Sequence, residues 1–341
     1  MTDRVLVTGI SGYIASHVAA RLVEQGFAVR GTVRNRAKGR RVLDAMATEG
    51  VDVSRIELVE AELGSDAGWA EAVAGCRFVQ HIASPFPLQA PSDREALVPQ
   101  ARAGAQRVLE NGFSVGAERI VMTSSVAAVM YQPGRGKAKT YGEHDWSDPE
   151  WKAMGAYTVS KTRAERSAWA YVEAQGLKGR LVTVNPGLVL GPDPFENGGA
   201  SLDAIRDMMR GEFPALPKLA FPVVDVRDCA SIHVAAMLRE GTGGRRLIAA
   251  NQTLSMRQIA DIIAERYPAA KLPKREAPNW ALRLMAMADD RVKTILADLG
   301  HTPTMDAGYV SSLTGVIPRP ARESVEATAD ALVENGEVAL A

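Results

Sequence analysis

A tyrosine and a lysine four residues apart are the side chains of this chain best suited to proton transfer. Tyr157 and Lys161 lie in Gly-Ala-Tyr-Thr-Val-Ser-Lys (155–161), and residues at this spacing share one face of a helix. A free phenol has a pKa near 10, too high for easy proton exchange at neutral pH. A neighbouring ammonium group favours the phenolate and can lower that pKa by roughly 1–3 units. The pair therefore predicts a general acid, Tyr157, tuned by Lys161.

Hydroxyl side chains that could hold a carbonyl oxygen occur upstream of this pair. Thr123, Ser124 and Ser125 end an apolar run that is typical of a strand, and ligands of doubly wound folds bind at the carboxyl ends of strands. A Tyr-x-x-x-Lys spacing or a lone serine is common in unrelated chains. Together they indicate a site that delivers a proton to a carbonyl oxygen.

The N-terminus supplies the second half of that chemistry. Gly9, Gly12 and Ala15 follow the first apolar run at the spacing Gly-x-x-Gly-x-x-Ala. Such small residues allow a tight turn, a close approach of backbone to pyrophosphate, and close packing of helix on strand. The helix that begins there directs unpaired N–H groups at phosphates. The alternative is an ordinary turn that binds no nucleotide, which the position directly after an N-terminal strand disfavours.

The end of the second predicted strand indicates which dinucleotide binds. The segment Gly-Thr-Val-Arg-Asn-Arg-Ala-Lys (31–38) has no acidic residue to accept from a ribose hydroxyl. Arg34, helped by Arg36 or Lys38, would instead bind a 2′-phosphate, because a guanidinium group matches that anion. The alternative is that these cations form a solvated loop. We expect the cofactor to be NADPH/NADP.

Short apolar runs alternate with amphipathic stretches over the first half of the chain, which predicts an α/β fold, a doubly wound parallel sheet (Rossmann fold). The predicted strands are 4–8, 28–33, 55–60, 77–82, 119–123 and 180–184, and the predicted helices are 14–25, 37–49, 66–74, 94–113 and 156–175.

Proline and glycine punctuate the chain after Asn185-Pro186-Gly187, where this alternation stops. A short helix is predicted over 202–211, and 223–239 and 245–250 are expected to form a helix and a strand that return to the main sheet. We therefore predict an NADP-binding domain of residues 1–187 plus 223–250. Residues 188–222 plus 251–341 would form a smaller, mostly helical C-terminal substrate lobe.

Composition excludes several function classes. Forty basic residues balance forty acidic ones in 341 residues, which favours neither nucleic acid nor anionic membranes as partners. No apolar run approaches the roughly 20 residues that span a bilayer, and the first residues do not form a signal segment. Cys76 and Cys229 form no metal or redox motif, so we expect no metal and a reduced, cytoplasmic protein.

The motifs together resemble the extended short-chain dehydrogenases/reductases, in particular the dihydroflavonol-4-reductase-like group and its microbial aldehyde and ketone reductases. The resemblance covers most of residues 1–235. It rests on Val-Thr-Gly-Ile-Ser-Gly-Tyr-Ile-Ala-Ser-His (7–17), Val-Arg (33–34), Gly-Cys-Arg-Phe-Val-Gln-His-Ile-Ala-Ser-Pro (75–85), Met-Thr-Ser-Ser-Val (122–126), Trp-Ser-Asp (146–148), Tyr-Thr-Val-Ser-Lys (157–161), Asn-Pro-Gly-Leu-Val-Leu-Gly-Pro (185–192) and Val-Asp-Val-Arg-Asp-Cys-Ala (224–230).

This resemblance implies specific roles. Ser125 would hydrogen-bond the substrate carbonyl, Tyr157 would donate the proton and Lys161 would assist it. The expected cofactor contacts are Gly9, Ser11, Gly12, Tyr13, Ile14, Arg34, Lys38, Glu62, Leu63, Ala83, Ser84, Pro85, Tyr157, Lys161, Pro186, Gly187, Leu188 and Val189. The expected substrate is a small carbonyl compound, reduced reversibly to an alcohol by a monomer or homodimer.

Some residues depart from the family pattern. Glu62 stands where relatives usually have Asp, and Met130 replaces a polar residue of the plant flavonoid reductases. The Asn-Trp-Tyr-Cys-Tyr signature of cinnamoyl-CoA reductases is missing, and Gly155-Ala156-Tyr157 replaces it. A broad aldehyde or ketone reductase fits better. The expected substrate pocket contains Phe86, Ser125, Met130, Phe195 and Phe221, with Trp151 and Phe213 as further candidates; ordinary core packing is the alternative for each aromatic residue.

Two other functions stay open at this point. A nucleotide-sugar epimerase or dehydratase would use NAD on the same fold, which the basic segment after the second strand disfavours. A non-catalytic NADP-sensing protein would typically lack the Tyr157 and Lys161 pair. His144 and His233 could act as bases, but we expect structural roles because the pair already supplies the proton.

Overall fold

A computed structural model describes residues 3–84, 91, 93–287 and 290–340. Seven strands form one parallel sheet in the order β10-β7-β5-β4-β1-β2-β3. They are β1 (Arg4–Val7), β2 (Ala28–Val33), β3 (Ile56–Glu60), β4 (Phe78–His81), β5 (Arg119–Thr123), β7 (Leu181–Pro186) and β10 (Arg246–Ala249). The predicted doubly wound α/β fold is confirmed.

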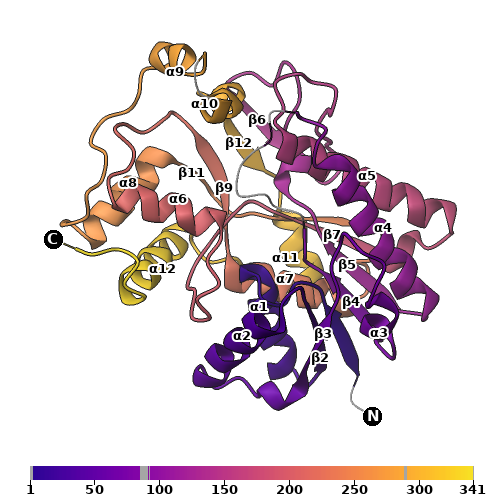
Figure 1. The fold of residues 1–341 in the computed structure, drawn as a ribbon. Coiled ribbons are helices and arrows are strands. Elements are labelled where there is room, and N and C mark those ends of the chain that lie inside the picture. The colour runs from indigo at the N-terminus through magenta and orange to yellow at the C-terminus, as the bar shows by residue number, and fades with distance from the viewer. Residues whose placement is uncertain (1–2, 85–90, 92, 288–289, 341) are drawn as a thin grey trace.

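Helices cover both faces of this sheet (Figure 1). Side chains alternate along β1, so that Val5 and Val7 pack with residues of one set of helices and Leu6 packs with residues of the other. The first set is α1 (Tyr13–Glu24), α2 (Arg36–Thr48) and α7 (Val226–Leu238). The second set is α3 (Trp69–Val73), α4 (Val98–Ser114) and α5 (Ala156–Ala174).

A smaller lobe surrounds a second sheet, whose order is β11-β9-β8. Its strands are β8 (Leu188–Leu190), β9 (Ala220–Asp225) and β11 (Thr253–Ser255), and its helices include α6 (Ala200–Met209), α8 (Met256–Arg266) and α12 (Ala321–Glu334). Buried residues of these elements, among them Met208, Ile263 and Leu332, form one apolar cluster. The lobe is therefore less exclusively helical than the sequence predicted.

A two-stranded sheet and several short helices complete the described fold. Strands β6 (Ala138–Tyr141) and β12 (Thr302–Met305) pair in parallel, and neither was predicted from the sequence. Helices α9 (Asn279–Met285) and α10 (Asp290–Ile295) precede β12, and α11 (Gly308–Thr314) follows it. Short 3-10 helices are η1 (Val53–Arg55), η2 (Val126–Ala128), η3 (Lys178–Arg180) and η4 (Leu296–Asp298).

Several boundaries differ from the sequence prediction, and the start of α7 is one of them. Residues 223–225 belong to strand β9, and the predicted helix over 223–239 begins only at Val226. The side chain of Asp225 accepts a hydrogen bond from the backbone N–H of Arg227, which marks the start of α7. The division into two domains stays a prediction, and Val310 of α11 packs in the core of the large sheet although its segment was assigned to the lobe.

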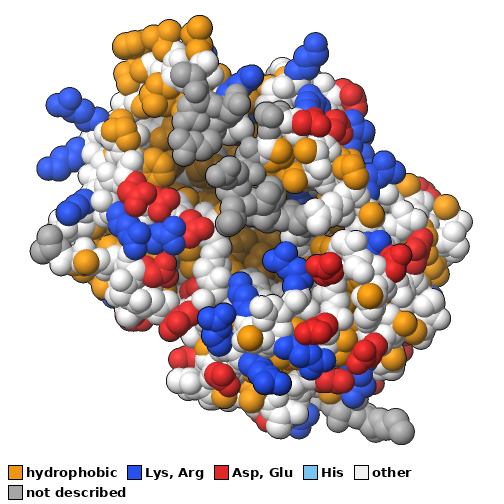
Figure 2. Space-filling model, viewed as in Figure 1, with side chains coloured by type: hydrophobic (Ala, Val, Ile, Leu, Met, Phe, Trp, Pro, Cys, Tyr) orange, Lys and Arg blue, Asp and Glu red, His pale blue; other side chains and the backbone are white. Residues whose placement is uncertain are grey.

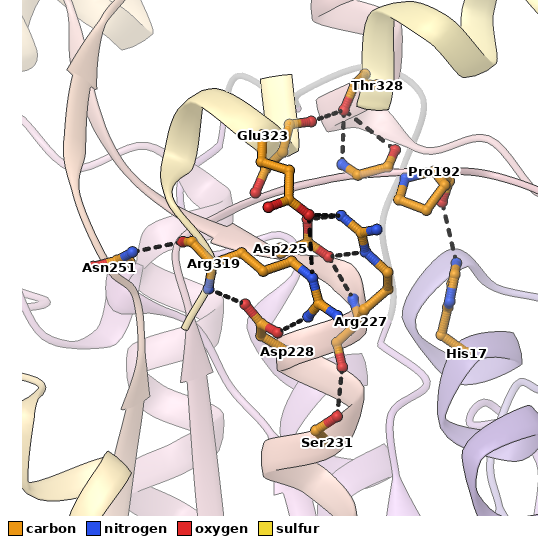
Figure 3. A network of polar contacts seen from close by, with 12 residues as sticks. His17, Pro192, Asp225, Arg227, Asp228, Ser231, Asn251, Arg319, Glu323 and Thr328 are labelled. Carbon is orange, nitrogen blue, oxygen red and sulfur yellow. Dashed lines mark hydrogen bonds and ion pairs between the residues drawn. The ribbon is translucent and has the colours of Figure 1, made fainter. Parts of the chain in front are cut away.

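A polar network joins the end of β9 and the start of α7 to Arg319 and to Glu323 of α12 (Figure 3). Arg227 pairs with Asp225 at 2.8 Å and with Glu323 at 3.2 Å. Asp228 accepts hydrogen bonds from the backbone and the guanidinium group of Arg319. Burial raises the pKa of Asp228, against the lowering effect of Arg319. These contacts fix the lobe to the large sheet.

Among the residues that the structure describes, we find no helix both long enough and apolar enough to span a membrane.

Candidate active site

A cavity of about 560 Å³ opens at the carboxyl edge of the large sheet. Its lining comes from the segments that end or follow β1, β2, β3, β4, β5 and β7, together with α5 and the start of α6. Figure 2 shows the surface hollowed between the large sheet and the lobe, with Lys and Arg side chains along one rim. This is the edge at which parallel doubly wound sheets bind ligands.

The loop after β1, which contains Gly9 and Gly12, lets a ligand come close to the backbone. Gly9 has φ +65°, and a Cβ there would lie 3.0 Å from the Cβ of Ala83. Helix α1 begins directly after Gly12, and no side chain caps it, so its first N–H groups are available to an anion. The hydroxyl of Thr8 accepts hydrogen bonds from the N–H groups of Ile82 and Ala83, which fixes the neighbouring loop beside Gly9.

We expect Gly9→Ala to weaken NADPH binding at least about tenfold. The added methyl group would have to occupy a left-handed backbone conformation, which costs about 1–2 kcal/mol, and it would press on Ala83. Titration of NADPH fluorescence measures the dissociation constant. Gly26→Ala is a matched control, because Gly26 has φ +85° but nothing lies within 4 Å of the position that a Cβ would take there. Unchanged affinity in Gly9→Ala would contradict this view of the loop.

Two of the three cations after β2 line the cavity. Arg34 and Lys38 are among its lining residues. Arg36 instead lies at an ion-pair distance of 3.5 Å from Glu60. Asn35 caps α2 by accepting from the N–H groups of Ala37 and Lys38, which sets where the Lys38 side chain leaves the helix. The sequence left open whether Arg36 or Lys38 assists Arg34, and the geometry favours Lys38.

The three predicted catalytic residues meet on one side of the cavity. Ser125 precedes η2 and accepts a hydrogen bond from the N–H of Ala127 at 3.1 Å. A hydrogen bond joins the side chains of Ser125 and Tyr157. The Nζ atom of Lys161 lies 5.9 Å from the centroid of the Tyr157 ring and 3.5 Å from the carbonyl oxygen of Thr123. Strand β5 and helix α5 thus bring the set together.

The pKa values of this set correct one expectation. Burial raises the pKa of Tyr157, and the hydrogen bond with Ser125 only partly opposes that rise. Burial also lowers the pKa of Lys161 to about 8, against the raising effect of Glu165. The prediction that Lys161 brings the pKa of Tyr157 below its ordinary value is wrong for this structure, because the cost of burying a phenolate is larger.

His144 and His233, the two histidines considered as possible bases, lie outside the cavity. His233 is buried, donates from Nδ1 to the carbonyl oxygen of Cys229 at 2.8 Å, and accepts from the hydroxyl of Thr123 at 2.7 Å. Its hydrogen bonds are therefore internal to the core, in keeping with a structural role. The His144 side chain is 95% exposed, 3.5 Å from Glu143. Neither histidine lines the cavity.

Most of the predicted cofactor residues line this one cavity. They are Gly9, Ser11, Gly12, Tyr13, Ile14, Arg34, Lys38, Glu62, Leu63, Ala83, Ser84, Tyr157, Lys161, Pro186, Gly187 and Val189. Leu188 belongs to β8 and is not among the lining residues. Pro85, also predicted as a cofactor contact, lies outside the described residues.

The predicted substrate residues are scattered. Ser125 lines the cavity, whereas Phe86 lies outside the described residues. Met130 is buried in an apolar cluster with Tyr141 and Met305. Phe195 is buried with its ring 5.2 Å from that of His17, and Phe221 packs on the core of the lobe. A substrate role for these three residues stays a prediction that the lining of this cavity does not support.

One segment of the lining was not among the site residues predicted from the sequence. Asn197, Gly198, Gly199, Ala200 and Ser201 place the N-terminus of α6 on the same cavity as that of α1. The Nδ2 atom of Asn197 donates to the hydroxyl of Ser16 at 2.7 Å, which links the two helix starts. The Asn-Gly-Gly run before a predicted helix was the available signal. Gln100 of α4 also lines the cavity, and nothing in the sequence pointed to it.

Within the part of the chain that the structure describes, no group of three or more His, Cys, Asp or Glu side chains is placed to hold a metal ion.

Comparison with known proteins identifies the class. Residues 5–249 match the model of the NAD dependent epimerase/dehydratase family, and the chain belongs to that family. Within it, the chain is an extended short-chain dehydrogenase/reductase of the dihydroflavonol-reductase and cinnamoyl-CoA reductase-like group.

Relatives from plants and fungi share most of their length with this chain. Cinnamoyl-CoA reductase CAD2 from Medicago truncatula is 32% identical over 81% of this chain and 84% of its own. Ketoreductase azaE from Aspergillus niger is 30% identical over 82% and 87%. The crystal structure of yeast methylglyoxal/isovaleraldehyde reductase Gre2 complexed with NADPH superposes with a TM-score of 0.80 at 26% identity, covering 98% of this chain and 100% of Gre2.

Proposed function

We propose that this protein is an NADPH-dependent carbonyl reductase that converts an aldehyde or ketone to an alcohol, reversibly. One observation carries the proposal: Ser125, Tyr157 and Lys161 line the same cavity as the Gly9 loop and the cations Arg34 and Lys38. The proton donor and the dinucleotide site would thus share one cavity. The names of the relatives, reductases of thioesters, ketones and aldehydes, support the same reaction type.

The residues present fit NADPH. The Gly9 turn leaves no room for a side chain, and two uncapped helix starts, those of α1 and α6, face the cavity where a pyrophosphate would need N–H donors. Arg34 and Lys38 would hold the 2′-phosphate. Pro186, Gly187 and Val189 would border the nicotinamide, which supplies hydride when it is bound.

The chain's own residues would perform the proton transfer. Ser125 and Tyr157, already hydrogen-bonded to each other, would hold the substrate carbonyl oxygen between their hydroxyl groups. A phenol with a raised pKa keeps its proton at neutral pH, which is the form that a reduction requires. The ammonium group of Lys161 would stabilise the phenolate that forms as Tyr157 releases its proton.

Lys161 should therefore set an alkaline limit on the reaction. Its pKa of about 8 means that the ammonium form predominates below that pH and is lost as the pH rises through it. We expect kcat/KM for reduction to fall above about pH 8, roughly tenfold per pH unit once the amine is neutral. Lys161→Arg should remove this fall, since arginine stays charged. A flat wild-type profile from pH 6 to 9.5 would contradict this role.

The name of the matched family is the one observation that supports the epimerase or dehydratase alternative. Against it, no acidic residue follows β2, where an NAD site needs one for the ribose hydroxyl.

We place the protein in the cytoplasm, as a monomer or homodimer. A reductase with broad apolar tolerance fits better than a cinnamoyl-CoA reductase, because Gly155-Ala156-Tyr157 replaces the signature of those enzymes.

A panel of carbonyl compounds tests the proposal. Aldehydes, α-keto compounds and aryl ketones would each be added to the purified protein with NADPH and, separately, with NADH. We expect at least one compound to cause a fall in NADPH absorbance that matches the alcohol formed. Tight NADPH binding without turnover on any compound would favour the sensing alternative. NAD retained through purification would favour the epimerase alternative.

A further inference from the structure

A buried carboxylate lies one helical turn beyond Lys161 and is not part of the proposed reaction. Glu165 follows Lys161 by four residues on α5, so Tyr157, Lys161 and Glu165 form one stripe along that helix. The Glu165 side chain is fully buried. Taking a carboxylate out of water is costly, so its surroundings must hold it with several donors.

Those donors come from the strand ends that carry the catalytic residues. The hydroxyl of Ser124 donates to Glu165 at 2.6 Å. The Nδ2 atom of Asn185 donates to Glu165 at 2.8 Å and also to the backbone carbonyl oxygen of Ser125 at 3.1 Å. The hydroxyl of Thr183 donates at 2.9 Å. One carboxylate therefore fixes the ends of β5 and β7 relative to α5, and with them the position of Ser125.

A buried cation, Arg246, pairs directly with Glu165. The Nε atom of Arg246 lies 2.7 Å from a Glu165 oxygen, and its guanidinium group stacks 3.7 Å from the centroid of the Trp146 ring. Arg246 also donates to the carbonyl oxygens of Glu143, Asp145 and Ala128, which hold it in place. Burial alone would raise the pKa of Glu165, but the charge and hydrogen bonds of Arg246 bring that pKa below its ordinary value.

Among the residues that the structure describes, few charged groups besides this carboxylate act on Lys161. On α5 it faces Tyr157 and Glu165, on β4 it faces His81, and Arg246 of β10 lies behind Glu165. His81 is neutral, since burial and then the charge of Lys161 lower its pKa to about 3. Glu165 is thus the group that opposes the loss of a proton from the buried amine.

We propose that Glu165 is a positioning residue of this reductase: its carboxylate fixes the Ser124–Ser125 strand end and keeps Lys161 in its ammonium form. The inference rests on the proposed function for its consequence in turnover. The contacts that carry it do not depend on which carbonyl compound is reduced. Two effects follow, one on geometry and one on charge, and two variants separate them.

Glu165→Gln tests the effect of charge. Without the carboxylate, the pKa of Lys161 should fall, so the alkaline decline of kcat/KM should move to lower pH by about one unit. The same displacement should appear in the 13Cε chemical shift of Lys161, titrated by NMR in lysine-labelled protein and assigned with Lys161→Arg. This second measurement needs no turnover. If the carbonyl panel shows no activity, the proposed function fails while the Glu165 inference is still tested.

Glu165→Asp tests the effect of geometry and serves if Glu165→Gln does not fold. It keeps the negative charge but withdraws the oxygens from Ser124 and Asn185. We expect kcat to fall about tenfold with the alkaline decline left where the wild-type protein has it. Asp228→Asn is the matched control, since Asp228 is a buried carboxylate in an ion pair with Arg319 (Figure 3) and is not among the residues that line the cavity. It should lower the melting temperature and leave the pH profile unchanged.

Two results would overturn the inference. One is a Lys161 titration that is the same in Glu165→Gln as in the wild-type protein. The other is a Glu165→Asp variant with full kcat, since the hydrogen bonds to Ser124 and Asn185 would then have no bearing on the reaction. In either case Glu165 would be a structural ion pair only.

Discussion

Tyr157→Phe is expected to bind NADPH as the wild-type protein does and to lose carbonyl reduction by roughly 100- to 10,000-fold in kcat. The substitution removes one oxygen atom from a partly buried ring, so packing on α5 changes little. Without the phenol, the hydroxyl group that is hydrogen-bonded to Ser125 in the cavity is lost. Steady-state kinetics with the best substrate of the panel measures the loss, and NADPH fluorescence measures binding.

Tyr171→Phe is a matched control for this experiment. Tyr171 lies on the same helix and is only partly buried, away from the cavity. Its loss of a hydroxyl group should leave kcat within a factor of two or so, as is usual for a surface change. A Tyr157→Phe variant with near wild-type kcat would mean that the proton comes from elsewhere, and the catalytic assignment would fail.

Arg34→Asp is expected to reverse the preference for NADPH over NADH. It removes a charge-assisted hydrogen bond to the 2′-phosphate and places a like charge beside that group, which together should cost about 3 kcal/mol, or roughly 100-fold in kcat/KM for NADPH. The new carboxylate could accept from the ribose hydroxyl of NADH, so kcat/KM for NADH should be kept or should rise.

Arg36→Ala controls for a general loss of positive charge in the same loop. Arg36 pairs with Glu60 rather than lining the cavity, so its loss should change the ratio of the two cofactors by no more than a few-fold. If Arg34→Asp keeps the wild-type discrimination, the 2′-phosphate is bound elsewhere. Comparable Michaelis constants for NADH and NADPH in the wild-type protein would also contradict the assignment.

The large sheet could be predicted from sequence because its signals are local. Short apolar runs between amphipathic stretches mark β1, β2, β4 and β5. The glycines after β1 lie within the turn that they form. The pair Tyr157 and Lys161 shares a helix, so spacing alone placed it. In these cases a residue and its structural partner are a few positions apart.

What the sequence did not show depends on contacts between distant segments. Strand β6 is stabilised by pairing with β12, which lies far along the chain, and its own residues carry no clear strand pattern. Asn197 meets Ser16 across a separation of 181 residues. The raised pKa of Tyr157 follows from burial, which spacing does not report. The role inferred for Glu165 likewise needs Ser124, Asn185 and Arg246 in one place.

The most direct test of hydride and proton transfer in this cavity is the fate of a label. The purified protein would reduce its best carbonyl substrate with NADPH deuterated at both C4 positions, and the alcohol would be analysed by mass spectrometry. We predict one deuterium on the carbinol carbon of every product molecule. Tyr157→Phe should form this product at a rate reduced by the factor given above. An unlabelled alcohol, or the same labelled product at the same rate from Tyr157→Phe, would contradict the account.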